Sequence, residues 1–205
     1  MAEYPNVMDP KRYRDTYNVS RFTTGNYQST QGVFAALNQY FSPSDLQSLQ
    51  VEYALPRLGQ PVTASYGNHS SDAKCIADRN NCGEGNLDVQ YIMTMSPRSP
   101  TTYWYTDNYF DSWLLEIANT KKPPLVLSIS YGSQEILVPT ITLDAFNVQA
   151  IKLGSMGVTI VAASGDSGSN TGDIADRGPS ACSYAPSFPG SNPYVISVGA
   201  TQVSL

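Results

Sequence analysis

Histidine is almost absent from this sequence, and an excess of positive charge is absent altogether. The 205 residues contain 1 His, and 12 Lys and Arg stand against 17 Asp and Glu, which gives a net charge of −5. This balance argues against nucleic acid and against a basic membrane-binding surface. No apolar run approaches the ~20 residues that span a bilayer, and residues 1–20 show no apolar core of a signal peptide. The sequence therefore predicts neither nucleic acid nor a membrane as a partner.

Cysteine is scarce as well, with three in the chain. Cys75 and Cys82 bracket a polar loop that a disulfide could close, whereas Cys182 has no evident partner. An odd count fits a chain that is missing part of itself, but three free thiols in a cytosolic protein would look the same. Sequons at Asn18 and Asn68 permit glycosylation if the protein is secreted. These residues leave the compartment open.

Apolar residues are plentiful by contrast, at 41% of the chain, while charged residues make up 14%. This composition indicates a globular protein with a substantial core. The chain shows no internal repeat and no linker, so we expect residues 1–205 to form a single domain or a large part of a bigger one.

The pattern along the chain changes near residue 84. Before it, apolar spacing predicts a helix over 33–41 that Pro43 ends, a short capped helix over 42–49, and a loop over 56–83. After it, helical and strand patterns alternate. We expect helices from Glu84 and over 110–119 and 139–157, and strands over 101–106, 125–132, 158–168 and 193–203.

This alternation with short connections predicts an α/β fold, in which helices cover a parallel sheet. Ligands of such sheets bind at the carboxyl ends of the strands. Those ends carry Ser130, Tyr131 and Gly132 after one strand, and residues 164–168 after another. We therefore expect the functional site at this edge.

The sequence GDSG at 165–168 invites a trypsin-like interpretation with Ser167 as nucleophile, but that family is built from antiparallel β-barrels. A Ser-His-Asp triad also needs an imidazole base, and the single candidate, His69, lies in a polar loop and is expected to be an ordinary surface residue. The glycine-rich stretch matches no phosphate-binding motif, and the scattered cysteines show no zinc-ligand spacing. These three classes of function are rejected.

Four motifs, EGNLDVQY, LSISYG, ASGDSG and PSFPGSNPYVISVGAT, resemble in order those of the sedolisin family of serine-carboxyl peptidases, most of all its tripeptidyl-peptidase branch. The resemblance implies a subtilisin-like fold. It implies Glu84 as general base, Asp88 as its orienting partner and Asp166 as the oxyanion residue. It also implies that the backbone at 130–132 pairs with an extended peptide substrate.

The chemistry of this family explains why acids stand at these positions. Glu84 and Asp88 are four residues apart, so on a helix they share a face. Two carboxyl groups that close cannot both ionise cheaply and should share one proton. Such a base works in acid, where an imidazole is protonated. Asp166 can stabilise an oxyanion only as a neutral hydrogen-bond donor. Both demands predict an acidic optimum, which suits a lysosome-like or extracellular setting.

The family's nucleophile belongs to an S-G-T-S motif beyond the last predicted strand, and the chain contains no such motif. The calcium site that the resemblance implies also belongs to that later part. We expect a fragment of an active enzyme first; a segment of a processed enzyme and a non-catalytic peptide-binding remnant remain the alternatives. Neither Ser164 nor Ser167 is expected to replace the nucleophile. Tyr131 and Trp104 could pack in the core or contact substrate.

Overall fold

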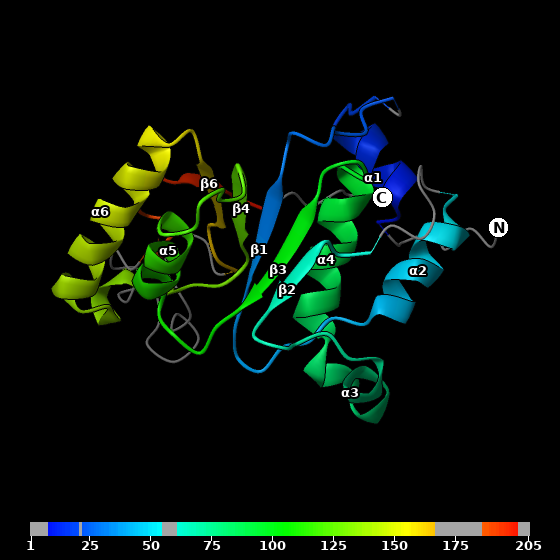
Figure 1. The fold of residues 1–205 in the computed structure, drawn as a ribbon, viewed down its shortest axis with the longest axis horizontal. Coiled ribbons are helices and arrows are strands. Elements are labelled where there is room, and N and C mark those ends of the chain that lie inside the picture. Colours follow the sequence, from blue (N-terminus) through cyan, green and yellow to red (C-terminus); the bar gives the residue numbers. More distant parts are fainter. Residues whose placement is uncertain (1–7, 21, 55–60, 167–185, 201–205) are drawn as a thin grey trace, which may run out of the picture.

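Helices cover a parallel sheet in the computed structural model, which describes residues 8–20, 22–54, 61–166 and 186–200 (Figure 1). The sheet has six strands in the order β2-β3-β1-β4-β6-β8, and every neighbouring pair is parallel. The strands are β1 (Gln31–Ala35), β2 (Ala64–Tyr66), β3 (Thr101–Tyr105), β4 (Val126–Ile129), β6 (Thr159–Ala163) and β8 (Ile196–Val198). The α/β prediction is confirmed.

Helices, 3-10 turns and a second, smaller sheet complete the described part of the chain. The helices are α1 (Pro10–Thr16), α2 (Pro43–Glu52), α3 (Asp72–Ala77), α4 (Gly83–Met95), α5 (Phe110–Ala118) and α6 (Thr140–Ser155), with 3-10 turns at Arg79–Asn81 and Glu135–Leu137. A separate antiparallel pair joins β5 (Ser133–Gln134) to β7 (Ser187–Phe188). Among the described residues, none of these helices qualifies as a membrane span.

The helix predicted over 33–41 is wrong, because this stretch contains the central strand β1. All five residues of β1 are buried, since helices cover both faces of the sheet at this strand. A strand buried on both faces loses the apolar–polar alternation that identifies strands in a sequence. Its apolar run then matches a helical period by coincidence.

The loop predicted over 56–83 is wrong in part, because β2, α3 and a 3-10 turn lie within it. The helix α1 was not predicted either. It is anchored by Arg14, whose guanidinium donates to the carbonyls of Thr94 and Met95 at the end of α4. These elements are three to seven residues long, which is too short for a periodic pattern to develop.

Two apolar cores lie on opposite faces of the sheet. One core joins α5 and α6 to side chains such as Phe34, Leu127 and Ile160. The other joins α4 and α2 to the alternate side chains of β1 and β3, among them Val33 and Tyr103. Figure 1 shows α5 and α6 on one side of the strands and α4 and α2 on the other.

The α4 side of β4, β6 and β8 is much less covered than the rest of the sheet. We call this surface the open face and define it by Val126, Val161, Ile196 and Val198. Val126, Ile196 and Val198 are 39%, 55% and 51% exposed, and Val161 is partly buried. The strand β4 is therefore buried on one face and partly exposed on the other.

Candidate active site

The helix α4 carries both acids of the predicted pair, Glu84 in its first turn and Asp88 one turn later. A disulfide joins Cys75 to Cys82, the residue directly before α4. This bond settles the alternative that the sequence left open for these two thiols. It ties the start of α4 to α3. The N-terminal end of the helix that bears the acids is therefore covalently fixed.

The loop after β1 holds the start of α4 against the sheet. The side-chain oxygen Oε1 of Gln39 accepts a hydrogen bond from the backbone N–H of Glu84, at 3.1 Å. The next residue, Tyr40, donates its own backbone N–H to the carbonyl of Asn81, at 2.8 Å. The first of these bonds satisfies one of the helix N–H groups that have no partner within the helix.

Gly85, between the two acids, allows α4 to approach this loop closely. A Cβ atom at this position would lie 2.2 Å from the carbonyl oxygen of Tyr40 and 2.6 Å from the hydroxyl of Tyr103. The contact with the Tyr40 carbonyl is compatible with a side chain only if the backbone moves. The position of the acid pair thus depends on a residue that has no side chain.

Asp88 lies between α4 and the end of β4, where Ser130 donates its hydroxyl to Oδ1 of the aspartate at 2.7 Å. Burial raises the pKa of Asp88 to about 7. The Ser130 hydrogen bond lowers that pKa, because it favours the ionised form, and the negative charge of Glu84 raises it further. Asp88 is consequently an acid that keeps its proton at mildly acidic pH.

The pKa of Glu84 is also raised, first by burial and second by the negative charge of Asp166. Asp166 is exposed and follows β6, two strands away from β1 in the sheet order. Asp166 acts on Glu84 and Glu84 acts on Asp88, so the fold brings these three residues near one another from sequence positions up to 82 residues apart.

The segment after β4 lies beside the acid pair. The ring of Tyr131 packs edge-on against Phe34, with ring centroids 5.3 Å apart. Burial and the nearby negative charges raise the pKa of its hydroxyl, so Tyr131 remains neutral. Gly132 approaches β7, where an added Cβ would meet the hydroxyl of Ser187.

Sequence comparison finds relatives that share most of this chain. It is 32% identical over 203 residues to tripeptidyl-peptidase 1 of Dictyostelium discoideum, an alignment that covers 94% of the chain and 31% of that protein. The mouse protein of the same name is 29% identical over 204 residues, which are 94% of the chain and 34% of that protein. The chain thus spans about a third of the length of these relatives. No protein-family model matches it.

The fold matches two solved peptidase structures. A Pseudomonas sedolisin, a serine-carboxyl proteinase in complex with pseudo-iodotyrostatin, superposes with a TM-score of 0.67 at 19% identity, over 93% of this chain and 52% of that one. The chain shares the fold of this sedolisin. A lanthipeptide protease gives a TM-score of 0.57 at 16% identity, over 94% of this chain and 53% of that one. At these identities, the two structures support a statement about the fold alone.

Other residues singled out in the sequence fall outside the acid cluster. Ser167 and Cys182 lie outside the described residues. Ser164 is described and donates its backbone N–H to the carbonyl of Val198. Trp104 packs in the core, and its indole N–H donates to Glu116, which favours packing over substrate contact for this residue.

His69 packs against two aromatic rings, which the sequence did not predict. Its ring centroid lies 3.3 Å from that of Tyr105 and 4.3 Å from that of Tyr40. The side chain is only partly buried and lies in a loop, as expected for a residue near the surface. The sequence carried no signal for this stack, because its members come from three separate segments.

A metal site is not formed by the described residues, since no group of three or more His, Cys, Asp or Glu side chains among them could hold an ion. The calcium implied by the family resemblance thus finds no fitting residues in this part of the chain. No step of the chemistry below uses it.

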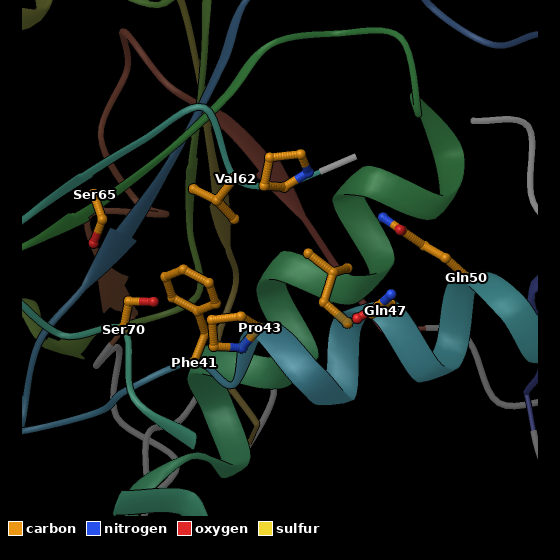
Figure 2. A pocket seen from close by; sticks show the side chains of 9 residues that line it. Phe41, Pro43, Gln47, Gln50, Val62, Ser65 and Ser70 are labelled. Carbon is orange, nitrogen blue, oxygen red and sulfur yellow. The ribbon is translucent and has the colours of Figure 1, made fainter. Parts of the chain in front are cut away.

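A groove of about 300 Å³ lies beside α2 (Figure 2). Its lining comes from α2 and the segments around β2. The residues are Phe41, Pro43, Leu46, Gln47, Gln50, Pro61, Val62, Ser65 and Ser70. None of them belongs to the acid cluster, so this groove is not the candidate active site.

Proposed function

We propose that this chain provides the acid half of a serine-carboxyl peptidase site that cleaves peptides at acidic pH. The proposal rests on one observation: a partly buried Asp88, with a pKa of about 7, interacts with Glu84, which in turn interacts with Asp166. In this proposal Glu84 is the general base, Asp88 holds the shared proton and orients Glu84, and Asp166 donates a hydrogen bond to the oxyanion. The nucleophilic serine comes from polypeptide outside these 205 residues.

The burial of Asp88 assigns the shared proton to this residue in the proposal. Asp88 retains its proton up to about pH 7, and the pKa of Glu84 is raised as well, by burial and by the negative charge of Asp166. In the proposed working state Asp88 is neutral and Glu84 carries the charge, so Glu84 can take a proton from a serine hydroxyl. Above about pH 7 Asp88 ionises, and the pair then holds two negative charges in a partly buried site.

The substrate would lie along the carboxyl edge of the sheet. The backbone at Ser130, Tyr131 and Gly132 extends beyond β4 next to the acids and is proposed to pair with an extended peptide. The named relatives are tripeptidyl-peptidases, so release of tripeptides from free N-termini is the proposed reaction. The disulfide at Cys75 and the exposed sequon residues Asn18 and Asn68 support an extracellular or lysosome-like setting.

Hydrolysis of a tripeptidyl reporter with a free amine tests this proposal. The natural polypeptide that carries these 205 residues and an S-G-T-S motif should cleave it at about pH 4–5 and lose activity above about pH 7. Glu84→Gln should lower kcat by at least about 10³-fold, because the base is lost. An N-acetylated reporter is the matched control for the requirement of a free N-terminus.

Two results would contradict the proposal. Equal activity at pH 4 and pH 8 would exclude a shared carboxyl proton as the basis of catalysis. Downstream coding sequence without a serine motif, together with peptide binding to the 205-residue chain, would instead favour the non-catalytic peptide-binding alternative.

A further inference from the structure

The side chain of Ser130 makes a contact that the proposed substrate role of its backbone does not require. Its hydroxyl donates to Oδ1 of Asp88 at 2.7 Å, across 42 residues of sequence. Ser130 directly follows β4, and Asp88 lies on α4, which packs on β1 and β3. The bond therefore links α4 to the end of β4, the strand next to β1.

We propose that Ser130 is a positioning residue that fixes which oxygen of Asp88 carries the proton shared with Glu84. A neutral carboxyl group has one hydroxyl oxygen and one carbonyl oxygen. Because Ser130 donates to Oδ1, that atom is the carbonyl oxygen, and the proton belongs on Oδ2. This inference rests on the proposed role of the acid pair and adds the group that orients it.

The same bond sets the strength of Asp88 as an acid. A hydrogen bond donated to a carboxylate favours the ionised form, so Ser130 opposes the effect of burial on the pKa of Asp88. Removal of the hydroxyl should leave a partly buried oxygen without its donor. Asp88 would then bind its proton more tightly and in either orientation.

Few other charges face Asp88 to complicate this effect. Among described groups, its electrostatic partners are Glu84 on the same helix, Tyr103 on β3 and Tyr131 after β4. Both tyrosines have raised pKa values and stay neutral across the acidic and neutral range. Glu84 is thus the partner that changes charge as Asp88 titrates, and the two carboxyl groups titrate as a pair.

Carbon-13 titration of the side-chain carboxyl groups in the 205-residue chain tests this inference without any need for turnover. Ser130→Ala should raise the higher midpoint of the Asp88–Glu84 pair by about one pH unit, which is about tenfold in proton affinity. Ser130→Thr keeps a hydroxyl and should restore the original midpoint. Asp88→Asn assigns the resonance.

Ser128→Ala is the matched control, because Ser128 lies two residues earlier on β4 and faces the same side of the sheet. Its substitution should leave the midpoint unchanged. Should Ser130→Ala not fold, Ser130→Cys offers a thiol of similar shape that donates weakly, and a smaller rise in the same direction supports the inference.

A midpoint in Ser130→Ala within about 0.2 pH units of the original chain, with the Thr variant likewise unchanged, overturns the positioning role. This outcome is separate from a failure of the proposed function. Absence of peptide hydrolysis would leave the titration intact, whereas an unchanged titration would leave a peptidase without this orienting bond.

Discussion

The two halves of the sheet differ in how their α4-side face is covered. In β1 and β3, side chains such as Val33 and Tyr103 are 1% and 0% exposed, because α4 and α2 pack on them. In β4 and β8, Val126 and Val198 on the same face are 39% and 51% exposed. The acid pair lies at the boundary, on the last helix that covers this face.

Because of this difference, one half of the sheet supports the acid pair and the other half leaves it accessible. The covered half fixes the backbone that carries Glu84 and Asp88, through a close helix–loop contact at Gly85. The open face leaves the opposite side of the pair available for other groups. In the proposed function, the nucleophile and the substrate approach from that side.

The largest effect should come from the charge state of Asp88 at this boundary. Its pKa is raised from an ordinary value of 3.8 to about 7, so its contribution to stability is complete below about pH 4 and is lost as the pH rises through about 7. We expect the free energy of unfolding to fall by at most about 4 kcal/mol between pH 4 and pH 8. Chemical denaturation at several pH values measures this change.

Asp88→Asn should remove most of that dependence, because the amide cannot ionise. The variant should therefore be more stable than the original chain at pH 8, while the difference shrinks towards pH 4. Parallel stability curves for the two proteins would contradict the assigned pKa. If additional polypeptide covers the open face, the midpoint in the longer protein should lie higher still.

Gly85→Ala tests how tightly the covered half holds α4. The added methyl group would meet backbone at the Tyr40 carbonyl, so the helix must shift, and we expect a loss of about 3 kcal/mol. Gly83→Ala is the matched control, since a Cβ there has no atom within 4 Å. Equal stabilities for the two variants, measured by urea denaturation, would show that the close approach is not maintained in solution.

A pair of valine truncations compares the two halves directly. Val33→Ala in β1 should cost about 2 kcal/mol of stability, because it leaves a cavity under α4. Val126→Ala on the open face should cost less than about 0.5 kcal/mol. Similar losses at both positions, in thermal or urea unfolding, would mean that the open face is covered by another part of the protein.

The parts of the fold that the sequence predicted are those with a distinctive local pattern. The helices α4, α5 and α6 have apolar residues at helical spacing, and β3, β4 and β6 are apolar runs bounded by turn residues. The central strand β1 was missed because both of its faces are buried. A window of sequence cannot distinguish that environment from a buried helix.

The acid cluster was likewise predictable only where its sequence pattern is local. The spacing of Glu84 and Asp88 places them on one helical face whatever the fold, and the structure confirms that helix. The Ser130 hydrogen bond and the need for glycine at position 85 depend on which strands are neighbours. Strand order is a tertiary property, so no local pattern in the chain contained these two contacts.

The strand order of the sheet makes the cluster of Glu84, Asp88 and Asp166 depend on assembly of the whole sheet. Glu84 comes from α4, which lies between β2 and β3 in the sequence, whereas Asp166 follows β6, and β1 and β4 lie between β3 and β6 in the sheet. A polypeptide that ended at β4 would contain Glu84 and Asp88 but not Asp166. Asp166 raises the pKa of Glu84. A titration of the single Glu84 side chain therefore shows whether strands far apart in the sequence have docked.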